Sequence, residues 1–278
     1  MIDRRTWMLG GGALLAGWMA GAGTAHAAIF ASRRIAVTVR GTGRDVLLIP
    51  GLASSPVIWN GVVSALPGYR WHLIHVRGFA GLAPEANATG ALLQPLTDEI
   101  DRYVRTQGLK RPALVGHSMG GTLAMMQGLR GVGDRVMVVD MLPAGAAMVG
   151  GTAGGMGFLA DQLGQYFTAT KAGRAYLAQI VGQMPGARGS DPDVIANALR
   201  ELAHIDLGPQ LPRLSLPLEV VYAVGADAAQ ATEITRRFRV AYAPKKDARL
   251  LPIGPSGHVV MADQPARFQA ALRTFLTR

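Results

Sequence analysis

Several short runs of the chain carry apolar side chains on both faces, and they constrain the fold more than any other feature. They occupy residues 46–49, 136–139 and 218–224. A strand with one face in water would alternate apolar with polar residues, so strands of this kind belong in a sheet that is covered on both sides. The sequence therefore predicts a sheet buried between layers of helices.

Seven strands are expected, and stretches of helical periodicity separate several of them. The strand candidates are Arg34–Arg40, Asp45–Pro50, Trp71–Val76, Pro112–Val115, Arg135–Asp140, Leu216–Val224 and Ala248–Pro252. Helical periodicity covers Gly90–Gly108, Met119–Gly131 and Gln264–Leu276. Strands that alternate with helices imply βαβ units. The expected fold class is therefore α/β, with a doubly wound, mostly parallel sheet.

Residues 143–214 break this alternation. They open with six glycines between Gly145 and Gly157, and helical segments without a convincing strand follow. A connection of about seventy residues is far longer than the usual link between two elements of a sheet. We therefore expect a helical cap inserted over the carboxyl edge of the sheet, on a core formed by residues 28–142 and 215–278.

The first 27 residues have the pattern of a signal peptide. The pair Arg4-Arg5 precedes an apolar run rich in glycine and alanine, and Ala25-His26-Ala27 follows as a cleavage site. The arginine pair resembles a twin-arginine signal, but Asp3 and Met8 depart from that pattern and leave the Sec route open. We expect export to the periplasm without a stable membrane span after cleavage. The alternative is an uncleaved membrane anchor.

Composition excludes several other classes of protein. The chain has no cysteine, which rules out disulfides and thiolate-ligated metal sites. Its 28 lysines and arginines against 18 acidic residues give a net charge of +10, but the arginines are scattered along the sequence, so we expect no nucleic-acid binding. The sequence contains no P-loop, no dinucleotide-binding glycine motif and no zinc-protease motif. Neither a cofactor nor a metal is therefore expected.

The strongest chemical signal is the segment Gly116–Gly121, which reads Gly-His-Ser-Met-Gly-Gly. It follows a predicted strand and opens a predicted helix, the context in which G-x-S-x-G forms a nucleophile elbow. Such a sharp turn crowds the backbone two residues before and after the serine, where only small residues fit. The pattern predicts Ser118 as a nucleophile, against the alternative of a passive serine in a glycine-rich turn.

With this motif the sequence resembles the α/β-hydrolase superfamily over nearly all of the expected mature chain. Further matching segments are Pro50-Gly51-Leu52 with Trp59 behind it, Gly78–Gly81, Gly225-Ala226-Asp227 and Gly257-His258. Two features depart from the family pattern. Pro50-Gly51 replaces the usual His-Gly, and a single residue separates Gly225 from Asp227, so that Ala228 fills the place where the acid is expected.

The resemblance implies a role for each matching residue. Ser118 would be the nucleophile, His258 the general base and Asp227 the acid that orients the histidine, since the order Ser, Asp, His is that of the superfamily. Asp140, at the end of another predicted strand, is the alternative acid, because some members place it there. The backbone N–H groups expected to form the oxyanion hole are those of Leu52 and Met119.

The function implied is that of a serine hydrolase, esterase-like, that cleaves a small ester or related acyl compound through an acyl-enzyme. The same residues leave open a cofactor-free perhydrolase or haloperoxidase-like activity and an aminopeptidase within the superfamily. A catalytically inactive binding protein on this fold is a further alternative. The expected partner is a small acyl substrate, and the sequence leaves the oligomeric state undetermined.

Overall fold

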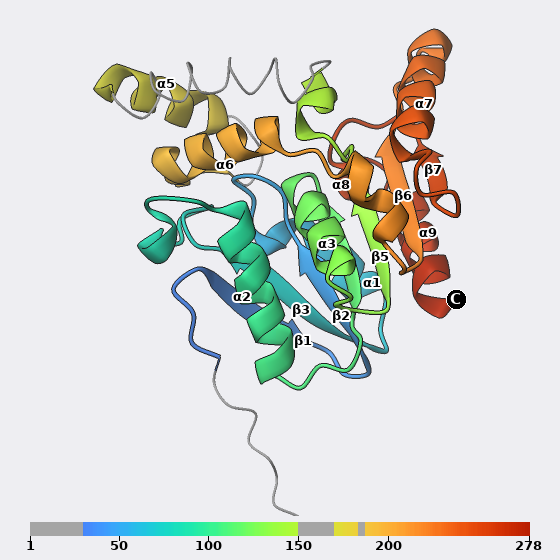
Figure 1. Cartoon of the computed structure of the whole chain (residues 1–278), viewed down its shortest axis with the longest axis horizontal. Coiled ribbons are helices and arrows are strands. Elements are labelled where there is room, and N and C mark those ends of the chain that lie inside the picture. The colour runs from blue at the N-terminus through green and yellow to red at the C-terminus, as the bar shows by residue number, and fades with distance from the viewer. Residues whose placement is uncertain (1–29, 150–169, 183–186) are drawn as a thin grey trace, which may run out of the picture.

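The computed structural model describes residues 30–149, 170–182 and 187–278 (Figure 1). The strands in these residues are β1 Ile35–Arg40, β2 Arg44–Ile49, β3 Tyr69–Val76, β4 Ala113–His117, β5 Arg135–Val139, β6 Leu218–Ala223 and β7 Arg249–Ile253. They form one sheet in the order β1-β3-β2-β4-β5-β6-β7. Only β1 is antiparallel to its neighbour, β3, and the other pairs are parallel. The predicted doubly wound, mostly parallel α/β fold is confirmed.

Helices cover both faces of this sheet (Figure 1). Helices α2 (Leu93–Thr106), α3 (Met119–Leu129) and α7 (Ala228–Tyr242) contribute buried residues to the core on one face. Helices α1 (Asn60–Ala65), α8 (Val260–Asp263) and α9 (Pro265–Thr277) contribute to the core on the other face. Both faces of the central strands are therefore buried.

Strand β2 explains why the apolar runs lack alternation. Leu47 and Ile49 belong to the core with α2 and α3, whereas Val46 and Leu48 belong to the core with α1 and α9. All four side chains have no measurable exposure. Successive side chains of a strand point to opposite faces, so a strand between two helical layers buries every residue.

The predicted strands agree with the observed ones to within two residues at each end, whereas helix α7 was not predicted. Its described buried residues are only Phe238 and Tyr242, because most of its surface faces solvent. The apolar periodicity that marks a helix in the sequence is accordingly weak there. This omission affects the site, because α7 begins directly after Asp227.

The chain between β5 and β6 forms no strand in its described residues. It contains α5 (Lys171–Gly182), α6 (Pro192–His204) and the 3₁₀ helices η3 (Gly145–Val149) and η4 (Gly208–Arg213). The carboxylate of Glu201 in α6 accepts hydrogen bonds from the amides of Leu92 and Leu93, at 2.6 and 2.8 Å. Leu92 is the N-cap of α2 and Leu93 its first residue, so Glu201 satisfies backbone donors at the helix start. Helix α6 is thereby joined to the core.

The predicted signal peptide lies outside the described residues. Within them, no helix combines the length and the apolar character needed to cross a membrane. The 3₁₀ helices η1 (Pro56–Trp59) and η2 (Glu85–Asn87) complete the described elements.

Candidate active site

Ser118 lies on the sharp turn between β4 and α3. Its backbone adopts φ 52° and ψ −123°, a conformation that costs energy for any residue with a side chain. The surroundings leave the turn little freedom: a Cβ on Gly116 would lie 2.0 Å from the Gly120 oxygen, and one on Gly120 would lie 2.2 Å from the Ile49 oxygen. The Ser118 amide also donates to the Val139 oxygen at 2.9 Å. Ser118 therefore lies on a tight strand–turn–helix segment, the geometry that a nucleophile elbow requires.

The turn after β2 lies directly against this elbow. A Cβ on Gly51 would lie 3.0 Å from both the Ser118 Cβ and the His117 Nδ1. This close approach brings the turn that contains Leu52 against the elbow. The amides of Leu52 and Met119 donate no hydrogen bond to any residue in the described part of the chain. Two such amides beside a serine can hold a developing oxyanion.

His258 pairs with Asp140. The His258 Nδ1 lies 2.6 Å from the Asp140 Oδ2, and the Asp140 Oδ1 accepts a hydrogen bond from the Ala223 amide at 3.0 Å. The Asp140 side chain is 10% exposed and that of His258 is 41% exposed. An ionised carboxylate can only accept, so Nδ1 carries the proton and Nε2 is left with its lone pair. The ring is thus oriented as a base should be.

Asp227, the acid favoured by the sequence, does not occupy this position. It is the N-cap of α7, exposed to solvent, and its Oδ1 accepts a hydrogen bond from the Gln230 amide at 2.7 Å. The carboxylate is used to satisfy a free amide at the helix start. Asp-x-x-Gln ahead of a helix resembles a capping box, and this pattern at Asp227–Gln230 could have identified the residue as a cap.

His117, the residue before Ser118, contacts the loop of His258. Its Nε2 donates to the backbone oxygen of His258 at 2.8 Å, and the two rings lie 4.6 Å apart. Burial, with a smaller contribution from nearby His258, lowers the pKa of His117 to about 4. His117 is therefore neutral around pH 7 and connects the residue before Ser118 to the loop of His258.

Ser190 connects the segment between β5 and β6 to the turn of Leu52, a contact for which the sequence gives no signal. Its Oγ accepts a hydrogen bond from the Ala80 amide at 2.8 Å and donates one to the Ala53 oxygen at 3.2 Å. Ala53, which follows Leu52, has a left-handed φ of 55°. Ser190 thus holds the backbone of Ala53, the residue after the predicted oxyanion donor Leu52.

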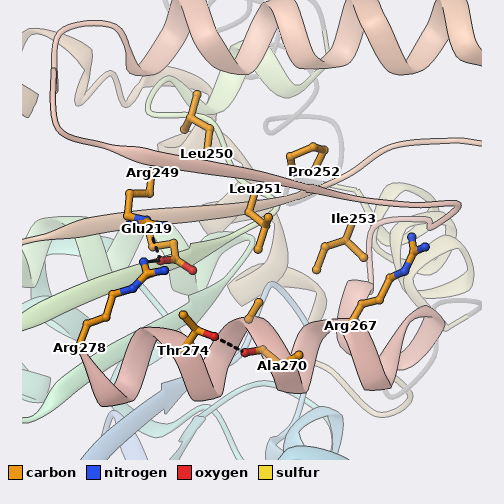
Figure 2. A pocket seen from close by; sticks show the side chains of 11 residues that line it. Glu219, Arg249, Leu250, Leu251, Pro252, Ile253, Arg267, Ala270, Thr274 and Arg278 are labelled. Atoms are coloured by element: carbon orange, nitrogen blue, oxygen red, sulfur yellow. Dashed lines mark hydrogen bonds and ion pairs between the residues drawn. The ribbon is translucent and has the colours of Figure 1, made fainter.

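Two cavities differ in their relation to these residues. The larger, of about 670 Å³, lies between β7 and α9, and Glu219 is held there by Arg249 and Arg278 (Figure 2). Its lining contains neither Ser118 nor a histidine. The smaller, of about 290 Å³, is bordered by Asp140 and His258. The chemistry described above therefore belongs beside the smaller cavity.

Metal ligation is not evident at the site. In the residues that the structure describes, no group of three or more His, Asp or Glu side chains is arranged to hold a metal ion. The arrangement at Ser118 provides a nucleophile, a base and amide donors, which together can transfer an acyl group.

Structural relatives share this fold over most of their length. A hydrolase from Pseudomonas aeruginosa PA01 has a TM-score of 0.70 and 17% identity, with 88% of this chain and 94% of that chain covered. The enol-lactonase from Burkholderia xenovorans LB400 gives 0.62 and 19%, and an esterase from Exiguobacterium antarcticum gives 0.66 and 19%. Both alignments cover 88% of this chain and 96% of the relative. No curated protein matches the chain in sequence.

The match to a family model extends over most of the chain. Residues 46–271 match the model described as alpha/beta hydrolase family. This range runs from β2 into α9 and includes the elbow, the His258 loop and the segment between β5 and β6. The chain is therefore a hydrolase-type member of the alpha/beta hydrolase family.

Proposed function

We propose that this protein is a serine hydrolase that cleaves a small ester through an acyl-enzyme on Ser118. The observation that carries the proposal is the 2.6 Å pair of His258 and Asp140, in a loop that His117, the residue before a serine held on a strained elbow, contacts through a hydrogen bond. A serine hydroxyl becomes a good nucleophile only when a base removes its proton, and a neutral imidazole suits that task near pH 7.

The first half of the reaction forms the acyl-enzyme. The Ser118 Oγ attacks the carbonyl carbon of the ester while the His258 Nε2 takes the hydroxyl proton. The carbonyl oxygen becomes an oxyanion, and the amides of Leu52 and Met119 donate hydrogen bonds to it. The tetrahedral intermediate collapses, the bond to the alcohol oxygen breaks, and the leaving alcohol takes the proton from His258.

The second half releases the acid. A water molecule gives a proton to His258 and attacks the acyl carbon, and the proton then returns to the Ser118 oxygen as the acyl–serine bond breaks. In both halves Asp140 keeps the Nδ1 proton in place and stabilises the imidazolium that forms. Asp140 takes the role that the sequence assigned to Asp227.

The ester class is supported by the chemistry of the residues and by the relatives. Two of the structural relatives are described as an esterase and an enol-lactonase, and both descriptions refer to acyl–oxygen substrates. At 19% identity, these two relatives support the fold alone. The choice of an ester as the substrate is therefore our inference.

A fluorophosphonate probe tests the proposal, because it reacts covalently with activated serines. We expect intact-mass labelling of the wild type, no labelling of Ser118→Ala, and a fall in kcat of about 10⁴–10⁶ for that variant on p-nitrophenyl esters. Ser64→Ala, which changes an exposed serine in α1, is the matched control and should label normally. Labelling that persists in Ser118→Ala would show that another serine reacts.

A further inference from the structure

The main chain of His258 is held by a single hydrogen bond. Its backbone oxygen accepts from the His117 Nε2 at 2.8 Å, and in the described residues neither its amide nor its oxygen has another hydrogen-bond partner. The His258 side chain is 41% exposed, so burial alone does not fix the ring. Two hydrogen bonds thus attach this residue to the sheet, one between its ring and Asp140 and one between its main chain and His117.

The two residues that hold His258 come from neighbouring strands and from the same register. His117 ends β4 and pairs with Val139, which ends β5 and precedes Asp140. The Ser118 amide donates to the Val139 oxygen at 2.9 Å, so the nucleophile belongs to the same frame. The pairing of β4 with β5 therefore fixes His117, Ser118 and Asp140 relative to one another, and His258 is attached to that frame at two points.

The His117 ring is itself enclosed. The residue is 5% exposed, and the turn after β2 lies so close that a Cβ on Gly51 would be 3.0 Å from the His117 Nδ1. The centre of the His258 ring lies 4.6 Å from that of the His117 ring. A side chain whose rotamer is locked by its neighbours presents its polar atom in one place. The Nε2 donor is therefore directed at the His258 oxygen by packing.

The state of the His117 ring argues against a purely structural role. Because its pKa is about 4, the ring is neutral near pH 7. A carbonyl oxygen can only accept, so the proton is on Nε2 and Nδ1 presents a lone pair. This Nδ1 is buried and has no hydrogen-bond partner in the described part of the chain. An unsatisfied buried nitrogen lowers stability, which an apolar side chain at the same place would avoid.

We propose that His117 is a positioning residue, which holds the His258 main chain so that the ring stays within reach of the Ser118 hydroxyl. The proposal rests on the serine hydrolase function above and adds a residue to the machinery of that reaction. A base has to remain within hydrogen-bond distance of the proton it takes, and a misplacement of about 1 Å costs about 100-fold in rate. Loss of the bond should therefore lower kcat rather than raise KM.

Replacement of His117 by glutamine or by methionine separates the hydrogen bond from the packing. The two side chains have the same length, but only glutamine has an amide donor near the place of Nε2. On p-nitrophenyl acetate we expect His117→Met to lower kcat about ten- to 100-fold at a similar KM. His117→Gln should stay within about threefold of the wild type, because it keeps the donor. Equal kcat for the two variants would overturn the proposal.

Urea unfolding of both variants provides the control for stability. His117→Met buries no unsatisfied nitrogen, so its free energy of unfolding should be at least that of His117→Gln. A fall in kcat that follows a fall in stability would indicate a structural role and overturn the proposal. If His117→Met is unfolded, His117→Asn replaces it, because the asparagine amide is too short to reach the His258 oxygen.

A measurement on His258 itself requires no catalysis. NMR relaxation gives the order parameter of the His258 amide, which should be about 0.85 in the wild type and in His117→Gln, and below about 0.6 in His117→Met. Equal order parameters in the wild type and His117→Met overturn the positioning role, even when Ser118 labels with the fluorophosphonate. A lower order parameter in His117→Met, without labelling of the wild type, keeps the attachment of His258 and overturns the serine hydrolase function.

Discussion

Asp140 uses both of its carboxylate oxygens, one for the His258 ring and one for the Ala223 amide. The second bond comes from β6, the strand next to β5, so the side chain is held in one orientation by the sheet itself. Its backbone has φ 51°, which directs the residue away from the line of the strand. A carboxylate held this way is suited to fix the tautomer of a histidine.

Replacement of the two acids by asparagine distinguishes their roles. Asp140→Asn should lower kcat by about 10⁴, because the asparagine can present its NH2 group to the His258 Nδ1 and favour the wrong tautomer while the geometry survives. Asp227→Asn should leave kcat within about tenfold and the free energy of unfolding nearly unchanged, because asparagine is as good an N-cap as aspartate. Steady-state kinetics and urea unfolding of both variants measure this, and the opposite ranking in kcat would return the acid to Asp227.

His117 makes stability depend on pH. Its pKa is about 4 in the folded protein because it is buried, against about 6.5 in an unfolded chain. As the pH falls from about 6.5 to 4, the unfolded state binds a proton that the folded state does not, so stability is lost over that window. His117→Asn should flatten this part of the curve, measured as the free energy of unfolding in urea at pH 7, 6 and 5. An unchanged pH dependence would contradict the assignment.

The sequence was sufficient to predict the nucleophile of this site but not its acid. The elbow of Ser118 was predictable because glycine spacing and the order of strand and helix are local properties. The identity of the acid was not, since Asp140 and Asp227 both follow predicted strands and only the path of the chain shows which reaches His258. Ser190 could not be inferred, because its partners Ala53 and Ala80 are distant in sequence.

At the scale of elements, the segment between β5 and β6 supports the site from outside the sheet. The Gly81 amide donates to the Gly189 oxygen at 3.1 Å, and the Asp191 amide donates to the Gly78 oxygen at 2.7 Å. Ser190, between these two bonds, holds the Ala53 backbone. The loop before α6 and the turn after β2 are thus fixed to each other.

Ser190→Ala should affect catalysis more than binding. Without the hydroxyl, the Ala53 oxygen and the Ala80 amide each lose a partner, and the Leu52 amide is less well held for the oxyanion. We expect kcat to fall by roughly three- to tenfold at a similar KM, because oxyanion contacts act in the transition state. Ser190→Thr, which keeps the hydroxyl, should recover most of kcat, and Ser64→Ala is the surface control. A rise in KM alone would assign Ser190 to substrate binding.

The central strands β2, β4, β5 and β6 were predictable for a physical reason that does not apply to α7. A strand buried on both faces must be apolar throughout, and that composition is visible in any single sequence. Helix α7 covers the edge of the sheet with Phe238 and Tyr242 while the rest of its surface is solvated. An element that buries so few side chains leaves only its cap, Asp227, as a sequence signal.

At the scale of the whole molecule, we propose that the protein is exported and matured. Cleavage after Ala27 should give a chain that begins at Ala28, measured by N-terminal sequencing of protein from the native host. Replacement of Arg4-Arg5 by two lysines should stop export if the twin-arginine route is used, and should have little effect if the Sec route is used. Full-length protein in the membrane fraction would instead identify an anchor.

Strand β7 ends the sheet, and its pairing with β6 is its only pairing among the described strands. Such a rim is a template on which another polypeptide can add by hydrogen bonding. Pro252 interrupts the row of amide donors, and Arg249 and Arg267 lie along the adjoining groove (Figure 2). Two copies meeting rim to rim would bring these cations together and would lack a donor at the proline. These two features oppose edge-to-edge pairing at β7, the kind of contact from which cross-β aggregates grow.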